Sequence, residues 1–537
     1  MSQNKDYLML KACVEADMSG LFTDAQYDYP LDSNVIDELN ELYSRLELES
    51  NDFSIFKYRK DIIDPLWRML IEKAIKCLRY CDEREPFGQP EQDKSPKAYG
   101  IKELQEYYNK YTEFEQILYG SSRYYRDHVV HVFRTWLSGV TLLIRDAGNG
   151  AGEYLNNIKI HEKDFQGKLS PREILSMWTI IALTHDLGYP LQTAKQIIDK
   201  THSMVSTFIS NPDISMDFSF RGVQNYMNDF IVRLMSSKMI KYKTEEIKKE
   251  DGKTIINQLF AARLQPKYYF KFQKSLERNS HGILSTIIIY KLLTYFLESD
   301  YNINEDYTFD LEDQRQFYIR REILRAIASH TCDDIYQLYT TSFSFLLRIC
   351  DDTQEWGRKN ITELYVNTSR EYELKDIGLY YDEELEQNIC VIDEAFTMTD
   401  IPEIITLINE MHKQSLTYVT VFRDGQDTDN RDFSFRRKLT IKHTGATILL
   451  ELKIDKDLES VLSGEIKYDK SDVEIKKAFS GEFCKKIHFF NWKTGLELYN
   501  RNENLCGRIT CNESSILEVP NNYGSWKSGR FNVLLSN

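Results

Sequence analysis

The residues best suited to chemistry are an adjacent histidine and aspartate, His185 and Asp186, at the end of the apolar run 174–183. His185 follows Trp178 by seven residues. This is helical spacing, so we expect His185 on a helix face that points into the core. A glycine and a proline follow within four residues of Asp186 and are expected to end the helix. Two polar side chains at this position are explained either by a satisfied core histidine with a capping carboxylate or by a bound metal ion.

Further histidines and aspartates lie in segments with the same helical character. A histidine opens the apolar segment 129–144, and another opens a helix expected from Ile283 to Phe296. A third follows apolar residues at spacings of three, four and seven, and an aspartate ends an apolar stretch before residue 352. In chain order these residues, each group on its own predicted helix, are His131, His185 with Asp186, His281, His330 and Asp351.

In this order the sequence resembles the HD superfamily of metal-dependent phosphohydrolases. The resemblance spans roughly residues 124–358 and is strongest at Ala182–Gly188 and Leu346–Arg358. Five elements in the family order form a far more specific signal than one His-Asp dipeptide. The resemblance implies a helical bundle that hydrolyses a phosphoester or phosphoanhydride bond of a nucleotide or signalling nucleotide through metal-activated water.

The resemblance also implies which residues bind metal. A first divalent ion would be held by His131, His185, Asp186 and Asp351. Asp186 would bridge to a second ion held by His281 and His330. Such mixed imidazole and carboxylate ligands suit Mn, Fe, Co, Ni or Zn and tolerate Mg. A bridged pair lowers the pKa of a water between the ions, which makes Asp186 part of the expected catalytic machinery.

Two neighbouring pairs leave the choice of ligand to interpretation. His128 precedes His131 by three residues and shares its helix face. We interpret His131 as the ligand because an apolar helix continues after it, as in the first motif of the family. His128 is then a catalytic proton-transfer or supporting group, or an exposed histidine at a helix start. Asp351 is likewise interpreted as the ligand, with Asp352 facing solvent or supporting the site.

Substrate binding requires cations beside the metal, because the expected substrate is polyanionic. Arg348 and Arg358 flank the last ligand and are preferred over Arg134 and Lys291, and each is alternatively a surface charge. Tyr189 occupies the position at which cyclic-di-GMP phosphodiesterases of this superfamily carry a lysine, which argues against that substrate. Tyr189 is expected to stack on a base, to donate a hydrogen bond to phosphate, or to belong to the core.

Composition limits the partners. The 537-residue chain is 42% apolar and 28% charged, as in ordinary globular proteins, and its net charge of −15 argues against a nucleic-acid-coating surface. The nine cysteines show no metal-binding spacing, and neither a signal peptide nor an apolar stretch of membrane-spanning length is visible. We therefore expect a cytoplasmic protein that binds a small-molecule nucleotide, with no membrane contact.

The elements that must position these residues suggest a multidomain, mainly α protein. Residues 1–120 are expected to form helices that pack on the core or form a homo-oligomer interface. Residues 121–360 are expected, from the resemblance, to form the HD-type helical bundle, in which Lys238–Lys253 is expected to be an exposed loop. Residues 361–537 are expected to form an α+β domain of unknown role. Its expected elements are the strands Tyr418–Phe422, Lys438–Lys442 and Ile448–Ile454 and the helix Glu403–His412.

Two alternatives to a nucleotide phosphohydrolase stay open. An HD-type nuclease on single-stranded nucleic acid would keep the metal, and its activity would fall steeply with salt. A non-catalytic sensor would bind a nucleotide and engage a partner through the C-terminal domain. Stabilisation by the ligand without turnover would identify the sensor.

Overall fold

The computed structural model describes much of the chain in segments. These are residues 33–48, 63–80, 100–121, 127–144, 153–165, 167–210, 223–248, 254–298, 307–332, 341–354, 371–382, 387–398, 433–443, 446–454, 462–468, 484–489, 495–500, 505–511, 515–520 and 526–530, and the single residues 6, 9, 11, 31, 301, 339, 358 and 407. The described chain is mainly helical, with one small and one large sheet, as the sequence predicted in outline.

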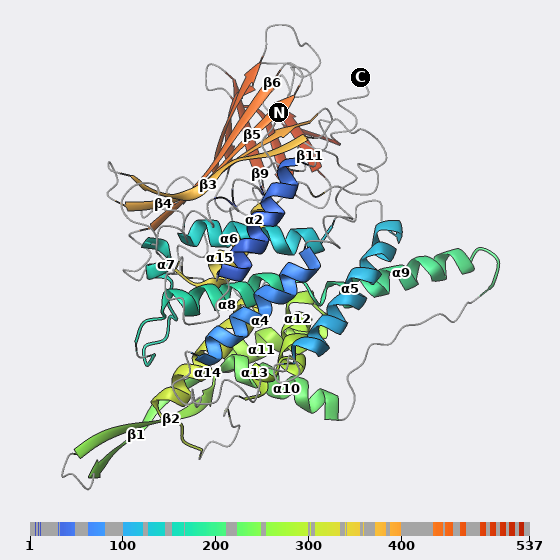
Figure 1. Cartoon of the computed structure of the whole chain (residues 1–537). Coiled ribbons are helices and arrows are strands. Elements are labelled where there is room, and N and C mark those ends of the chain that lie inside the picture. The colour runs from blue at the N-terminus through green and yellow to red at the C-terminus, as the bar shows by residue number, and fades with distance from the viewer. Residues whose placement is uncertain are drawn as a thin grey trace.

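A bundle of buried helices forms the core (Figure 1). Its central helix, α8 (Pro171–Thr184), packs against α6 (Val129–Ile144), α14 (Leu311–Ser329) and α15 (Phe343–Thr353). Another helix, α12 (His281–Leu292), packs on α14. Every residue of α6 except Arg134 is buried, which explains why its sequence is apolar on all sides rather than on one stripe.

Local sequence determines both ends of α8. Ser170 accepts a hydrogen bond from the backbone of Glu173, whose side chain accepts one in return, and Pro171 occupies the first turn. After Thr184 the chain turns at Gly188 and enters α9 (Tyr189–Val205). A Cβ atom at Gly188 would lie 2.4 Å from the carbonyl oxygen of His281. Glycine is therefore required for this turn to approach the start of α12.

The N-terminal helices close one side of this turn. They are α2 (Ser33–Leu48), α4 (Asp64–Tyr80) and α5 (Ile101–Ser121). The Trp67 indole donates a hydrogen bond to the carbonyl of Leu183 at 2.8 Å, and the Tyr107 hydroxyl donates one to the carbonyl of Leu187 at 2.8 Å. The last carbonyls of a helix lack intrahelical partners, so the bond from Trp67 satisfies a group that α8 leaves open, and the bond from Tyr107 holds the turn that follows α8. The region thus packs directly on the end of α8.

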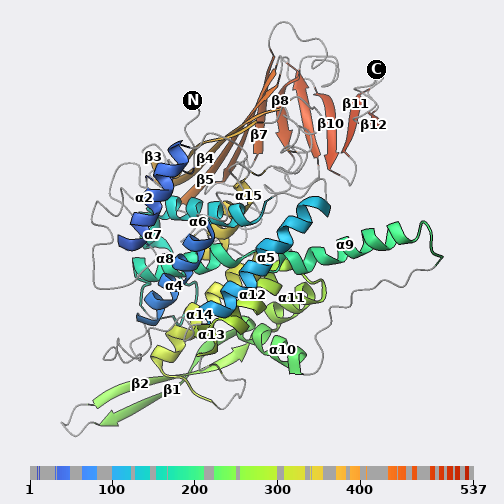
Figure 2. The ribbon, with the colours of Figure 1, turned by 45° about the vertical axis from the view of Figure 1, so that its right-hand side comes forward.

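Smaller elements surround the bundle. They are α7 (Glu153–Asn157), α10 (Val223–Ser236), α11 (Pro266–Glu277) and α13 (Thr294–Leu297). The helix predicted from Ile283 to Phe296 is interrupted at Leu293, whose extended backbone separates α12 from α13 and whose side chain is fully buried. Figure 2 shows α9 extending outward from the bundle.

A long ribbon of two antiparallel strands, β1 (Ser237–Lys248) and β2 (Thr254–Leu264), leaves the bundle at its lower end (Figure 1). The prediction of an exposed loop over Lys238–Lys253 was wrong for its described part. The segment is rich in charge because both faces of the outer ribbon meet solvent, so the alternation of apolar and polar residues that marks a half-buried strand is missing.

The C-terminal region forms a ten-stranded sheet above the bundle, with its strands in chain order. They are β3 (Glu371–Asp382), β4 (Gln387–Thr397), β5 (Phe433–His443), β6 (Ala446–Ile454), β7 (Leu462–Tyr468), β8 (Cys484–Phe489), β9 (Gly495–Asn500), β10 (Leu505–Cys511), β11 (Ser515–Pro520) and β12 (Trp526–Arg530). All neighbours pair antiparallel except β4 with β5, and β3 packs on α6.

Two of the predicted C-terminal strands are confirmed. Lys438–Lys442 lies in β5 and Ile448–Ile454 lies in β6. The predicted strand Tyr418–Phe422 lies outside the described residues, as does the predicted helix Glu403–His412 apart from the helical residue Leu407. Among the helices that are described, none has both the length and the apolar content needed to cross a membrane.

Candidate metal centre

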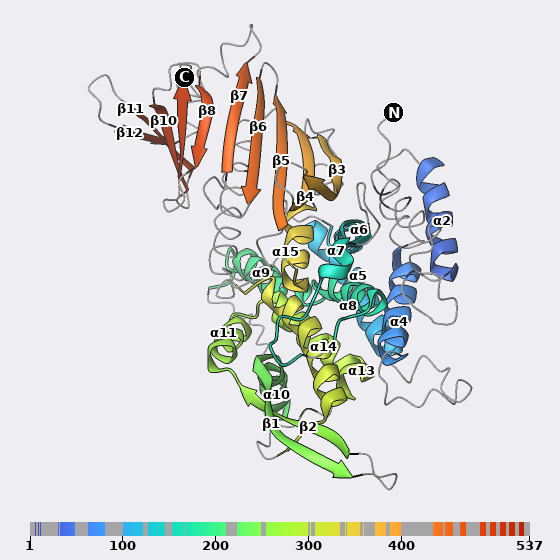
Figure 3. The same cartoon turned by 90° about the vertical axis from the view of Figure 1, so that its left-hand side faces the viewer.

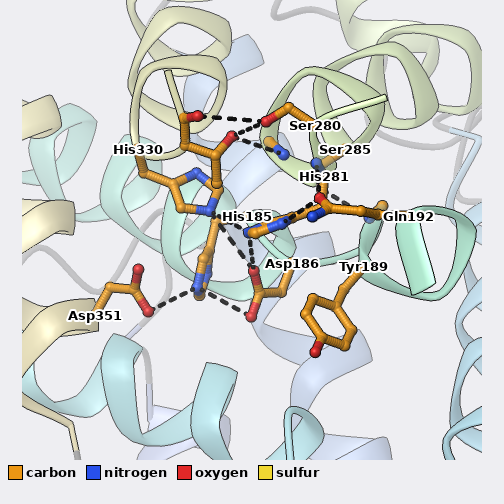
Figure 4. Close-up of polar contacts among 12 residues, drawn as sticks. His185, Asp186, Tyr189, Gln192, Ser280, His281, Ser285, His330 and Asp351 are labelled. Atoms are coloured by element: carbon orange, nitrogen blue, oxygen red, sulfur yellow. Dashed lines mark hydrogen bonds and ion pairs between the residues drawn. The ribbon is translucent and has the colours of Figure 1, made fainter. Parts of the chain in front are cut away.

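Six side chains that are far apart in the sequence come together among the helices of the bundle, and Figure 4 labels all of them except His131. They come from the first turn of α6, the turn after α8, the first residue of α12, the residue after α14 and the last turn of α15. The residues are His131, His185, Asp186, His281, His330 and Asp351. The structure therefore brings together every residue that the sequence predicted as a metal ligand.

One group of donor atoms surrounds Asp351. Its Oδ1 lies 2.8 Å from His131 Nε2 and 3.6 Å from His185 Nε2. The other carboxylate, Asp186, places Oδ2 at 3.6 Å from His185 Nε2 and 4.0 Å from His131 Nε2. Ligand atoms about 2.1 Å from one metal ion lie about 3 to 4 Å from one another. These four side chains thus have the spacing of a single coordination shell.

A second group uses the other oxygen of the same aspartate. Asp186 Oδ1 lies 3.2 Å from His281 Nε2 and 3.6 Å from His330 Nε2. The two imidazole nitrogens are 3.1 Å apart. Asp186 therefore stands between two clusters and turns one carboxylate oxygen toward each.

The hydrogen bonds of the histidines determine which ring nitrogen carries the proton. His185 Nδ1 lies 2.7 Å from the carbonyl of Ala182, and His330 Nδ1 lies 2.5 Å from the carbonyl of Ile327. A backbone carbonyl only accepts, so both Nδ1 atoms are donors. The other ring nitrogen, Nε2, is the one that faces the carboxylates and is available as a ligand in each neutral ring.

Two glutamines perform the same task for the other histidines. Gln192 Oε1 accepts the backbone N–H of His281 at 2.7 Å and also lies 2.8 Å from His281 Nδ1. Gln354 Oε1 lies 2.5 Å from His131 Nδ1. With Nδ1 donating to an amide oxygen, the Nε2 lone pair of each ring points inward.

These residues fit a metal ion on physical grounds. Four imidazole lone pairs and two carboxylates converge, and in neutral rings the Nε2 atoms of His281 and His330 would direct lone pairs at each other across 3.1 Å. His185 Nε2 is buried and has no hydrogen-bond partner among the described residues. A cation between the donors would satisfy all of them at once. The hydrogen bonds at Nδ1 are also those that metal-binding histidines usually make.

The electrostatics of the cluster also favour positive charge. Burial would raise the pKa of Asp186 and Asp351, but the adjacent histidines outweigh burial and hold both pKa values well below the ordinary range. Burial lowers the pKa of His131 and His330. Burial also acts to lower the pKa of His185, but the two carboxylates prevail and raise it to about 9. The ionised carboxylates thus attract a proton or a cation.

His128 lies beside this cluster and not in it. Its ring stacks on Tyr189 with centroids 3.8 Å apart and is 6.2 Å from the ring of His131. The alternative of an exposed histidine at a helix start was wrong, since only 7% of His128 is exposed. Burial, reinforced by Arg358, holds its pKa well below the ordinary value. Tyr189 also meets the ring of His281 edge-on, so it forms one wall of the site (Figure 4).

The predicted phosphate-binding cations differ in their surroundings. Arg134 is bound by the carboxylate of Asp6 at 2.9 to 3.0 Å, and Arg348 faces Asp352 at 4.0 Å. The positive charge of Arg358 lowers the pKa of both His128 and His131, so this guanidinium lies near the centre. Its Nε is buried and makes no hydrogen bond within the described structure. Of these three arginines, Arg358 has the surroundings that best suit an anionic ligand.

Sequence reasoning assigned no role to Gln192 or Gln354. Gln354 follows Asp351 by three residues and so shares its helix face, which is a signal that could have been used. Gln192 lies on α9, and only the approach of α9 to α12 brings it to His281. Ser285, which accepts the backbone N–H of Gly188 at 2.8 Å, was missed for the same reason.

Comparison with known proteins adds no relative to this geometry: no family model, curated protein or solved structure matches the chain. The functional assignment therefore depends on the site itself. What the structure shows is two overlapping groups of buried histidine and aspartate side chains that could hold metal ions.

Proposed function

We propose that this chain is a metal-dependent phosphohydrolase of the HD type that hydrolyses a phosphoester or phosphoanhydride bond of a nucleotide or signalling nucleotide. The observation that carries the proposal is Asp186, whose two carboxylate oxygens face two separate groups of histidines. This is the arrangement that a carboxylate bridging two divalent ions requires. The order of the motifs in the chain, which resembles that of the HD superfamily, supplies the reaction class.

Each residue has a defined task in this proposal. His131, His185, Asp186 and Asp351 would hold one cation, and His281 and His330, together with Asp186, would hold the other. When bound, divalent ions polarise a phosphoryl oxygen and lower the pKa of an attacking water. Arg358 neutralises phosphate charge, because its guanidinium lies near the ligands and keeps an unused buried N–H.

The aromatic wall orients the rest of the substrate. Tyr189 stacks on the buried ring of His128 and stands beside His281, and in this proposal the Tyr189 ring is the flat group against which a nucleobase lies. The ring of His128 lies 6.2 Å from that of His131, and in this proposal it serves as a proton-transfer group for the reaction. Both residues therefore act on the substrate and not on the cations.

Metal content and hydrolysis measured on the same preparations test the proposal. We expect about two transition-metal ions per chain in the wild type, and release of phosphate or a nucleoside phosphate from a nucleotide panel with Mn²⁺. Asp186→Ala should lose both ions and the activity. Asp352→Ala is the matched control, because Asp352 is an adjacent carboxylate that faces Arg348. This variant is expected to retain both metal ions and the activity.

The alternatives give distinct results. A single bound ion would remove the bridging role of Asp186. Absence of metal after reconstitution would refute the enzyme proposal and leave a nucleotide-binding sensor. Activity confined to single-stranded nucleic acid, falling steeply as salt is added, would replace the nucleotide substrate with a nuclease function.

A further inference from the structure

The ribbon of β1 and β2 lies at the opposite end of the bundle from the ten-stranded sheet (Figure 3). Its root is fixed to the core. Arg321 donates a hydrogen bond to the carbonyl of Ser237, and the Tyr318 hydroxyl bonds both backbone groups of Met239 at 3.0 Å. Farther out the ribbon is exposed, with Tyr242 56% and Ile256 64% accessible. A two-stranded ribbon alone in water is only marginally stable, so a further strand would stabilise it.

The register of the ribbon shows which backbone groups of β1 face outward. Phe260 of β2 exchanges both of its hydrogen bonds with Phe309, so it faces away from β1. The residue before it in β2 pairs with Lys243. Because facing alternates along an antiparallel pair, Lys243 and Glu245 direct their backbone groups toward β2, and Thr244 directs its own outward. Within the described structure, no other strand pairs with this outer edge of β1.

The outer edge of β1 is complementary to itself in charge. Two such edges can meet antiparallel with Thr244 opposite the Thr244 of a second copy. Lys243 of each copy then lies opposite Glu245 of the other. These positions form non-hydrogen-bonded pairs, in which side chains come closest. Lys243 and Glu245 already contact each other within one chain at 2.6 Å, so four charges of alternating sign would surround the twofold axis.

We propose that two copies of this chain associate through the outer edges of β1 and form a four-stranded antiparallel sheet in the order β2, β1, β1, β2. The β1–β2 register shifts between Lys241 and Lys243, so the regular outer edge begins after Tyr242, and Thr244 and its counterpart exchange two backbone hydrogen bonds at the twofold axis. The Tyr318 hydroxyl occupies the edge at Met239, which confines the added strand to the part of the ribbon that stands clear of the helices. The interface is isologous, as a symmetric dimer requires.

Charge exchange provides the decisive test. The full-length chain and its variants are analysed by sedimentation velocity and light scattering. We expect the wild type to be a dimer. In the Lys243→Glu variant, glutamates lie opposite each other at both cross-strand pairs of residues 243 and 245. In the Glu245→Lys variant, lysines lie opposite each other at the same two pairs. The dimer of each variant should therefore dissociate at least about tenfold more readily than that of the wild type. An equimolar mixture of the two variants should form a heterodimer, and the double variant carrying both changes should again be a homodimer.

Proline substitution separates edge pairing from a general loss of structure. Thr244→Pro removes an outward N–H from the β1 edge and should yield monomers. Ile256→Pro removes an outward N–H from the opposite edge of the same ribbon and should leave the dimer intact. A wild type that is monomeric at every concentration would refute the proposal. So would a dimer that persists in both charge variants, because it would use another surface. Neither result bears on metal binding, so this proposal fails independently of the proposed function.

Discussion

The helical bundle and the C-terminal sheet bring their residues together in opposite ways. In the bundle, side chains between His131 and Asp351 come from five separate helix ends, and each lies within about 4 Å of Asp186 or Asp351. In the sheet, strands β3 to β12 lie beside their neighbours in the chain. Sequential strands give a sheet that grows by local pairing, whereas a bundle collects distant positions into one cavity. In the described structure, the candidate chemistry lies in the part built from distant contacts.

The two regions meet close to the candidate metal centre. The Tyr372 hydroxyl on β3 donates to Glu394 on β4 and lies 3.4 Å from the carbonyl of Thr353, at the end of the helix that carries Asp351. Glu394 in turn accepts a hydrogen bond from Arg437 on β5 at 2.6 Å, and both are buried. The sheet is thus joined to the bundle by a short series of polar contacts. Substitutions in the bundle and in the sheet can therefore both test this connection.

The largest effect is expected in the bundle. Asp186→Ala should reduce hydrolysis by at least about 1,000-fold, which corresponds to about 4 kcal/mol in the barrier, because both groups of ligands lose their shared carboxylate. Turnover of a nucleotide substrate with Mn²⁺ measures the loss, and circular dichroism checks the fold. Retained activity would show that the chemistry lies elsewhere in the molecule.

The next largest effect is expected in the sheet. Glu394→Ala leaves the buried guanidinium of Arg437 without its carboxylate, a change that typically costs about 3 to 5 kcal/mol of stability. Thermal unfolding should show a lower midpoint for the C-terminal region while the metal content stays close to that of the wild type. Simultaneous loss of metal would show that the sheet and the bundle are one cooperative unit.

A smaller effect should follow from the glutamines that orient the ligands. Gln192→Leu removes the acceptor for His281 Nδ1, and we expect metal affinity to fall by about 10- to 100-fold with little loss of stability. Gln192→Glu keeps an acceptor at that point and should retain tighter binding than the leucine variant. Competition with a chelator measures both affinities, and equal affinities would exclude the orienting role.

The smallest effect tests the junction itself. Tyr372→Phe removes the hydroxyl that joins β3 to the end of α15, and loss of one such hydrogen bond should cost about 1 kcal/mol. If the junction positions Asp351, the variant should also bind the metal ion more weakly in the same chelator assay. An unchanged metal affinity would limit Tyr372 to holding the sheet on the bundle.

Local sequence determined the elements whose signals are complete within a few residues. The capping box of Ser170 and Glu173, the helix Val129–Ile144 and the strands at Lys438–Lys442 and Ile448–Ile454 were all readable, because each signal is contained in the residue types of its own segment. The order of histidines and aspartates also indicated which residues meet. The role of each one as a metal ligand stays a prediction that metal analysis will test.

Tertiary structure alone decided the relations between distant segments. Gln192 reaches His281 only because the glycine turn at Gly188 seats α9 against α12. The charged segment from Lys238 becomes a strand only because it pairs with Thr254–Leu264, a partner that no pattern within the segment reveals. Packing selects hydrogen-bond partners that are far apart in the chain, so these partners leave no periodic signal in the sequence. Candidate metal-binding side chains, by contrast, can be recognised in the sequence from their residue types.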